Sequence, residues 1–246
     1  MAWFIPTLIG QWFFAYHVAE TYLATAFAGN VAAWNQRLFV GLVAGDVIGN
    51  AALGVHLFIA FYVTVAGTLQ LIPQIRVYAP KFHRWNGRLY ILAAFMTSLA
   101  ALYMIWTRDT FGPDVLEIAV SIDGVLIIIF AAITLHYAVV RRIDVHQRWA
   151  LRTFIVMSGV WFTRVIYAVL GAVPGDTPGA ADDMSGPTNV AIGFASYLLP
   201  LAMLEFYFFA KGGSNSFAKF AAAAVVVTAA FATGVGVYGT AVTWMR

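Results

Sequence analysis

The sequence has no cysteine and few charged residues. Of its 246 residues, 10% are charged and 62% are hydrophobic, and the mean hydropathy is +0.82. The missing cysteine excludes disulfides, thiolate metal sites and cysteine nucleophiles. Soluble domains carry about 25% charged residues, so the scarcity of charge excludes a soluble enzyme or nucleic-acid-binding domain. We therefore expect a lipid bilayer as the solvent and no nucleic acid as a partner.

Long apolar runs fill most of the chain. A helix needs roughly 20 mostly apolar residues to cross the hydrocarbon core of a membrane. Continuous apolar runs of this length favour helices over membrane strands, whose residues alternate. Seven such runs occur, at 3–25, 50–72, 86–106, 116–138, 149–171, 188–210 and 220–243. The sequence therefore predicts a single transmembrane domain over 1–246, an all-α polytopic bundle of about seven spans.

Two connections between these runs are long. Residues 172–187 are rich in Gly, Pro and Asp and are expected to form an exposed loop. Residues 26–49 contain three glycines at intervals of four, a spacing that can form a close helix-packing face. Because 38–49 is too short to cross a membrane, we prefer the interpretation that it forms a short helix at the membrane interface.

The basic residues gather on one side of the predicted bundle. Ten of the 14 lysines and arginines fall there: Arg76, Lys81, Arg84, Arg88, Arg141, Arg142, Arg148, Arg152, Lys211 and Lys219. By the positive-inside rule this side is cytoplasmic, which predicts a cytoplasmic N-terminus and a periplasmic C-terminus. The net charge of +3 is thus read as an orientation signal.

Two predicted cytoplasmic helix entrances resemble each other. HRWNGRLY at 83–90 and HQRWALRTF at 146–154 each begin with a histidine and then place a tryptophan and an arginine within two turns. The planar guanidinium suits phosphate or carboxylate oxygens, and helix N-termini expected at 86 and 149 would add free N–H groups. The residues expected to bind an anionic ligand such as a lipid headgroup are His83, Arg84, Arg88, His146, Arg148 and Arg152. The alternative is that these residues only anchor the topology.

Three segments carry a resemblance to a known family. They are GNAALGVH at 49–56, GTLQLIPQIR with HRWNGRLY at 67–90, and HQRWALRTFIVMSGVWFTRV at 146–165. They resemble the bacterial predicted-membrane-protein family named domain of unknown function 2306, over roughly residues 45–210. The resemblance implies a multi-pass bundle in a bacterial inner membrane. It implies no established activity, substrate or cofactor.

The histidines suggest a cofactor. They sort into an outer layer, His17 and His56, and an inner layer, His83, His136 and His146. Because a b-type haem takes axial imidazoles from two helices, His17, His56 and His136 are candidate haem or metal ligands, with haem b as the cofactor. His17, Glu20 and His56 together also offer a ligand set for Zn or Fe.

Other charged residues lie within the predicted spans, where a charge costs roughly 2.5–3.5 kcal/mol on insertion scales. Asp123 and Arg164 both fall in the outer part of adjacent spans, which predicts a buried ion pair. With Glu205 they are candidates for a proton path. No lysine lies in any predicted span, so a retinal Schiff base is excluded.

Three functional hypotheses remain open. The preferred one is a non-enzymatic membrane bundle, or an accessory subunit of a membrane complex, with a cytoplasmic-side site for lipid headgroups. Its partners would be membrane lipids and other membrane subunits. The alternatives are a b-type haem protein that moves electrons across the membrane, and a small transporter or proton path.

Overall fold

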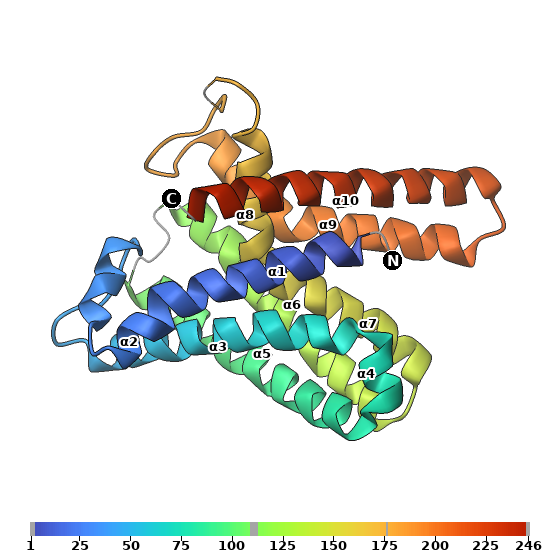
Figure 1. The fold of residues 1–246 in the computed structure, drawn as a ribbon, viewed down its shortest axis with the longest axis horizontal. Coiled ribbons are helices and arrows are strands. Elements are labelled where there is room, and N and C mark those ends of the chain that lie inside the picture. Colours follow the sequence, from blue (N-terminus) through green and yellow to red (C-terminus); the bar gives the residue numbers. More distant parts are fainter. Residues whose placement is uncertain (1–2, 109–112, 176, 245–246) are drawn as a thin grey trace. The chain divides into compact units, whose positions relative to one another are not determined.

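The computed structural model describes residues 3–108, 113–175 and 177–244, and within these ranges the chain forms helices and no strand (Figure 1). The elements in order are α1 (Phe4–Val18), the π-helical η1 (Ala19–Ala24), α2 (Thr25–Phe27), the 3-10 helix η2 (Val31–Gln36), α3 (Val47–Leu71), α4 (Pro73–Tyr78), α5 (Pro80–Arg108), α6 (Asp114–Val139), α7 (Ile143–Met157), α8 (Gly159–Leu170), α9 (Pro187–Gly212) and α10 (Ser216–Trp244). The predicted all-α class is confirmed.

Five of the described helices are long and apolar enough to cross a membrane: α3, α5, α6, α9 and α10. The number becomes six if α7 and α8, which are separated at Ser158, count as one broken span. The remaining predicted span, 3–25, coincides with α1, η1 and α2, and α1 alone has 15 residues. The total of seven spans and the orientation of the termini stay predictions.

Two helices begin earlier than the apolar runs predicted. α5 begins at Pro80 rather than at 86, and α7 begins at Ile143 rather than at 149. The predicted helix starts, and the free N–H groups expected there, are therefore wrong. Hydropathy marks the part of a helix that contacts lipid, whereas a polar sequence continues the helix beyond it. Proline is favourable in the first turn of α5 because it has no N–H to satisfy.

The chain divides into two compact units. Unit 1 comprises Met1–Phe13 and Ser158–Arg246, and unit 2 comprises Phe14–Met157. In unit 1, α8, α9 and α10 pack against one another. Nε2 of the buried Gln11 donates a hydrogen bond to Oγ of Ser158 (2.9 Å), the residue at which the helical run breaks before α8. The prediction of one transmembrane domain stays a prediction.

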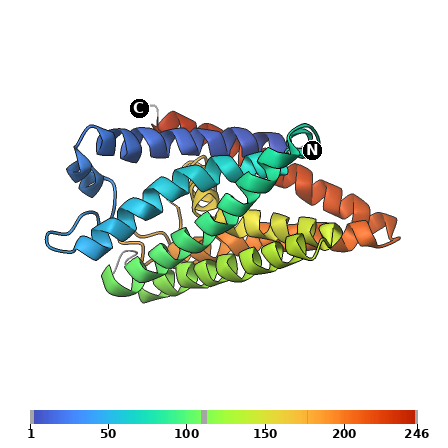
Figure 2. The same ribbon diagram turned by 90° about the horizontal axis from the view of Figure 1, so that it is seen from below.

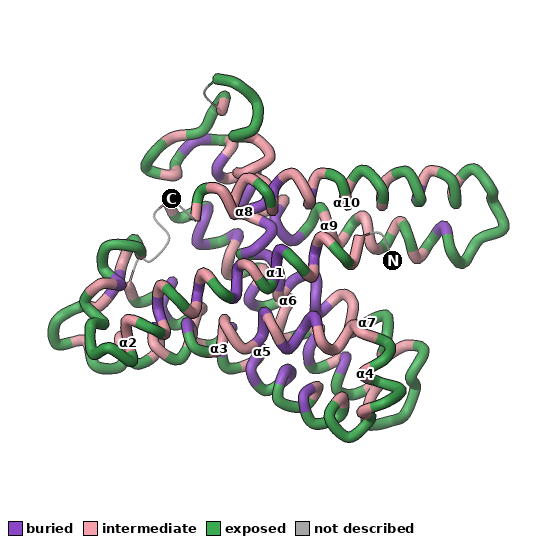
Figure 3. Tube along the Cα trace, in the orientation of Figure 1, coloured by how far each residue is buried: buried purple, intermediate pink, exposed green. Residues whose placement is uncertain are grey.

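In unit 2, α3 packs on α5, α5 on α6, and α6 on α7. Small residues allow these helices to approach closely, as is usual in membrane bundles. Ala66 of α3 and Ala93 of α5 lie in one buried cluster, and Ala94 of α5 and Ala131 of α6 lie in another. Met157 packs against both clusters. Figure 3 shows buried positions along the facing sides of these helices.

Polar contacts join α3 and α5 along their length. Nδ1 of His56 lies 3.1 Å from the carbonyl oxygen of Thr97, roughly midway along the pair. Nearer to α4, Nε2 of Gln70 donates to the carbonyl oxygen of His83 (3.2 Å). Interhelical hydrogen bonds of this kind contribute about 0.6 kcal/mol each in a membrane. They fix the alignment of α5 on α3, and with it the position of the first turns of α5.

At the other end of this pair, the segment between η2 and α3 is irregular. The expected short helix over 38–49 is therefore wrong, because α3 begins only at Val47. Amide side chains, instead of helical backbone contacts, bind the N–H and carbonyl groups of this segment. Asn35 exchanges two hydrogen bonds with Leu42, and Asn50 exchanges two with Val43. Side chains that bond to nearby backbone compete with helix formation in this way.

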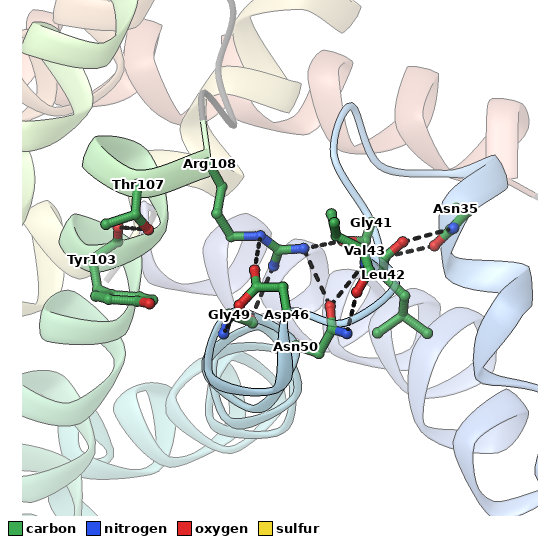
Figure 4. A network of polar contacts seen from close by, with 10 residues as sticks. All are labelled: Asn35, Gly41, Leu42, Val43, Asp46, Gly49, Asn50, Tyr103, Thr107 and Arg108. Carbon is green, nitrogen blue, oxygen red and sulfur yellow. Dashed lines mark hydrogen bonds and ion pairs between the residues drawn. The ribbon is translucent and has the colours of Figure 1, made fainter.

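Arg108, at the end of α5, fastens this irregular segment to α3 (Figure 4). Its side chain is 3% exposed, and Nε lies 3.1 Å from Oδ2 of Asp46. Nη1 donates to the carbonyl oxygen of Gly49 (2.9 Å), and Nη2 donates to that of Gly41 (2.6 Å) and to Oδ1 of Asn50 (3.2 Å). Asp46 also caps α3, since its Oδ1 accepts from the N–H of Gly49 (2.8 Å). No pattern in the sequence predicts these contacts of Arg108.

Candidate anion-binding site

The two predicted anion-binding elements lie at the same end of unit 2. Figures 1 and 2 both place α4 and the first turns of α5 and α7 there, and we call this the α4 end. His83 lies in the first turns of α5, and His146 in those of α7. Arg76 of α4, Arg84 and His146 lie close enough to His83 to interact with it electrostatically. The structure thus brings both predicted elements into one basic region.

An arginine stacks on a tryptophan in each element. Cζ of Arg88 lies 4.9 Å from the centre of the Trp85 ring, and Cζ of Arg152 lies 4.7 Å from that of Trp149. In both cases the arginine follows the tryptophan by three residues, which places the two side chains on one face of the helix. The guanidinium donors lie in the plane of the group, so an arginine whose face covers an indole can still bind oxygen atoms along its edge.

The two elements also share an arginine before the tryptophan and an aromatic residue at the end. Aligned on Arg-Trp rather than on histidine, both read Arg-Trp-x-x-Arg-x-aromatic, at 84–90 and 148–154. The aromatic residues, Tyr90 and Phe154, are buried. A Cβ built on Gly67 of α3 would lie 3.0 Å from Cε2 of Tyr90 and 3.2 Å from Cδ2 of Phe154. The two elements therefore meet at one point of α3.

Buried hydrogen bonds hold the first element in place. Asn86, between Trp85 and Arg88, is 7% exposed. Its Nδ2 donates to the carbonyl oxygen of Ala66 (3.2 Å), and its Oδ1 accepts from the hydroxyl of Tyr62 (3.1 Å). Both partners belong to α3, so this stretch of α5 is fixed to α3.

The second element is held to α6. Oγ1 of the buried Thr153 donates to the carbonyl oxygen of Trp149 (2.9 Å) and lies 2.8 Å from Oγ1 of Thr134. Nδ1 of His146 lies 3.0 Å from the carbonyl oxygen of Thr134. Because a carbonyl only accepts, Nδ1 of His146 carries the proton in this contact. Side chains locked by such contacts are suited to binding, since little ordering remains to be done when a ligand arrives.

The charge of this end is strongly unbalanced. Segments 73–88 and 139–152 contain one acidic residue, Asp144. They contain eight basic residues: Arg76, Lys81, Arg84, Arg88, Arg141, Arg142, Arg148 and Arg152. Arg84, Arg88 and Arg148 are exposed, whereas His83, His146 and Arg152 are partly buried. Such a concentration of positive charge at helix ends attracts anionic headgroups.

Of the other candidate ligands, His17 and His56 lie far from this region in the chain, whereas His136 lies in the last turn of α6, just before segment 139–152. His56 contacts Thr97 as described above, and the exposed His136 has its ring edge-on to Tyr137, with centroids 5.2 Å apart. His17 lies near the end of α1. Within the described part of the chain, no group of three or more His, Asp or Glu side chains is placed to hold a metal ion. A haem or metal at these histidines stays a prediction.

Asp123 and Arg164, the predicted ion pair, belong to different units. Oδ1 of Asp123 in α6 is buried without a hydrogen-bond partner. Nη1 of Arg164 donates to the carbonyl oxygen of Val160 in its own helix (2.9 Å). Glu117, which the sequence analysis did not single out, is 8% exposed, and its Oε1 also has no hydrogen-bond partner. The ion pair and a proton path through Asp123 and Glu205 stay predictions.

The apolar helices and the absence of strands from the described residues define a helical, multi-pass membrane protein. A family model described as "Predicted membrane protein (DUF2306)" matches residues 53–183. This stretch includes both Arg-Trp-x-x-Arg-x-aromatic elements and Gly67. The chain belongs to the DUF2306 family, as the sequence resemblance implied. No curated protein and no solved structure matches it.

Proposed function

We propose that this protein is a non-enzymatic membrane bundle that binds the phosphate of an anionic lipid headgroup at the α4 end. Under this proposal it acts in a bacterial inner membrane, either alone or as an accessory subunit of a membrane complex. The observation that supports the proposal best is the pair of stacked side chains, Arg88 on Trp85 and Arg152 on Trp149, at nearly equal distances of 4.9 and 4.7 Å.

The chemistry of these pairs suits a headgroup. Tryptophan favours the interface between hydrocarbon and water, where it can pack against the upper part of an acyl chain. The stacked guanidinium offers several N–H donors in one plane, which match the oxygens of a phosphate. Each basic residue near an anionic membrane surface contributes about 1 kcal/mol of attraction. Specific binding requires more than this attraction, and the fixed Arg–Trp geometry is what would supply it.

The alternative, a basic anchor without a specific site, makes a different prediction for matched variants. Arg88→Gln/Arg152→Gln removes two positive charges from the stacked pairs. Lys211→Gln/Lys219→Gln removes two from exposed positions in the last turn of α9 and the first turn of α10. The proposal predicts that phospholipid phosphorus retained by the detergent-purified protein falls sharply in the arginine variant and stays near the wild-type amount in the lysine variant.

Equal losses in both variants would show that only total charge matters, and would leave the elements as topology anchors. Size-exclusion profiles and helical circular dichroism should match those of the wild type in both variants, because Arg88 and both lysines are exposed and Arg152 is partly buried.

A second candidate function, haem binding, is favoured by the hydrogen bonds of two histidines. Nδ1 of His56 faces the carbonyl oxygen of Thr97 (3.1 Å), and Nδ1 of His146 faces that of Thr134 (3.0 Å). Histidines that ligate metals usually donate one ring N–H to such a carbonyl and ligate through the other nitrogen. A Soret band and a reduced α-band in protein purified from its native membrane would support haem. Their absence from such a preparation would rule it out.

A further inference from the structure

We infer that the phosphate at the α4 end binds against His83, among Arg76, Arg84 and His146, and that His83 takes up a proton as the phosphate binds. This inference rests on the proposed function and names the regulation of the same site. It gives a binding role to Arg76 of α4, which is not among the residues that the sequence predicted to bind an anion, and it makes binding depend on pH.

Three elements bring basic groups to His83. Arg76 belongs to α4, and Arg84 follows His83 in α5. His146 belongs to α7. Each of the three acts electrostatically on the imidazole of His83. Arg76 and Arg84 are exposed, and Arg84 lies one turn before the stacked Arg88 on the same side of α5. A phosphate here would be attracted by all of these groups and would adjoin the first Arg–Trp pair.

The imidazole of His83 has an unused polar atom. Its Nδ1 is buried and has no hydrogen-bond partner among the described residues. Buried polar atoms are nearly always hydrogen-bonded, so an unpaired one indicates a missing partner. In the protonated ring both nitrogens are donors, and a phosphate offers only acceptor oxygens. A phosphate is therefore a suitable partner for the protonated form of His83.

Hydrogen bonds from other helices fix both histidines of this cluster. Nε2 of the uncharged Gln70 in α3 donates to the carbonyl oxygen of His83 (3.2 Å), and the N–H of His83 donates to the carbonyl oxygen of Ala79 (3.0 Å), between α4 and α5. Nδ1 of His146 lies 3.0 Å from the carbonyl oxygen of Thr134 in α6. The cluster is thus held in place before a ligand arrives, which favours binding.

The surrounding charges give the sign of the pH dependence. Arg76, Arg84 and His146 disfavour a proton on His83, whereas a phosphate anion beside the ring favours one. Coupling between two ligands is reciprocal, so a proton on His83 strengthens phosphate binding by the same factor as phosphate strengthens proton binding. The affinity is therefore highest at low pH. It falls as the pH rises through the range in which His83 of the complex releases its proton.

Titration of the detergent-solubilised full chain with phosphatidylglycerol tests the proton uptake, because this phosphodiester keeps a single negative charge at about pH 6 and at about pH 8. We expect the affinity at the lower pH to be at least about fivefold higher. His83→Gln should bind more weakly and lose this difference, whereas His136→Gln, a change of an exposed histidine in α6, should keep it. Equal wild-type affinity at the two values, or a difference that survives in His83→Gln, would overturn the inference.

A matched pair of exposed residues tests the place of binding without changing a histidine. At the lower pH, Arg76→Gln should weaken binding at least about tenfold, as expected for the loss of a charged hydrogen bond. Lys81→Gln removes a charge from the same end and should cost at most about fivefold, the general attraction of one cation. Size-exclusion profiles of both variants should match the wild type, since both residues are exposed.

The failures of the two proposals are distinguishable. Equal losses in Arg76→Gln and Lys81→Gln would overturn binding at His83 and leave the proposed function standing. No binding of phosphatidylglycerol by the wild type at either pH would overturn both. Dimethyl phosphate, a phosphodiester anion without acyl chains, should bind far more weakly than the lipid. Equal affinity for it, with the same dependence on Arg76, would support binding at His83 and overturn a lipid as the ligand.

Discussion

Tyr90 and Phe154 lie on different helices, α5 and α7, and both pack against the backbone of Gly67 on α3. Both are buried, at 6% and 3% exposure. Each ends an Arg-Trp-x-x-Arg-x-aromatic element, so this contact holds the ends of both elements against the same turn of α3. The absence of a side chain at Gly67 makes the arrangement possible.

Gly67→Ala should therefore destabilise the protein. The added methyl group would lie 3.0 Å from Cε2 of Tyr90, 3.2 Å from its hydroxyl oxygen and 3.2 Å from Cδ2 of Phe154, and both rings are confined by packing. Overpacking of this kind costs about 1–3 kcal/mol of unfolding free energy. A titration with SDS in mixed micelles measures the loss. Gly54→Ala, in the same helix with nothing within 4 Å of the new methyl group, is the control and should be neutral or slightly stabilising.

Arg108→Ala should cost roughly 3 kcal/mol, because it leaves Asp46, two backbone carbonyls and the Asn50 amide oxygen without their common donor. Arg108→Lys should recover only part of this loss, since an ammonium lacks the planar fork that reaches all four groups. The rate of limited proteolysis in the segment between η2 and α3 measures the effect, and it should rise in the Arg108 variants. Arg37→Ala, an exposed change at the start of that segment, should leave the cleavage rate unchanged with a protease that does not cut after arginine; faster cleavage in this control would argue against the Arg108 contacts as the cause.

Asn86→Ala should cost about 1–3 kcal/mol, because the carbonyl of Ala66 loses the amide donor and the hydroxyl of Tyr62 keeps only its 3.3 Å contact with the backbone carbonyl of residue 86. Tyr62→Phe removes only one of these hydrogen bonds and should cost about 0.6 kcal/mol. The same SDS titration compares the two. If lipid binding depends on a fixed first element, Asn86→Ala should also weaken the binding of anionic phospholipid more than Tyr62→Phe does. Equal lipid binding by the two variants would show that the loss of stability does not affect the lipid site.

A double-mutant cycle tests the predicted ion pair of Asp123 and Arg164. Asp123→Asn and Arg164→Gln should each destabilise the protein, and the double variant should recover part of the sum. Coupling of about 0.5–3 kcal/mol is typical of side chains in contact. Additive effects would show that the two side chains do not interact.

The sequence predicted the helices well and their ends less well. Apolar runs located α3, α5, α6, α9 and α10 because hydrophobicity is what holds a span in the membrane. They missed the first turns of α5 and α7, which are polar and held by hydrogen bonds that hydropathy does not record. The break at Ser158 was missed too, although a Ser-Gly pair is a frequent cause of helix breaks.

The candidate site was predictable in composition but not in geometry. Matching His, Trp and Arg in two segments identified its residues. The stacking of Arg88 and Arg152 follows from their i, i+3 spacing and could have been expected from sequence. The contact of Tyr90 and Phe154 with Gly67 could not be predicted from sequence, because it depends on three helices packing together. The Arg108 contacts with Asp46 and Gly41 were hidden for the same reason, since they join residues far apart in the chain.

The most direct test of the proposed function is an experimental structure of the protein in nanodiscs that contain an anionic phospholipid. We expect phosphate density within hydrogen-bond distance of the guanidinium group of Arg88 or Arg152, with an acyl chain beside Trp85 or Trp149. Ordered lipid elsewhere on the protein, with no phosphate at either arginine, would contradict it.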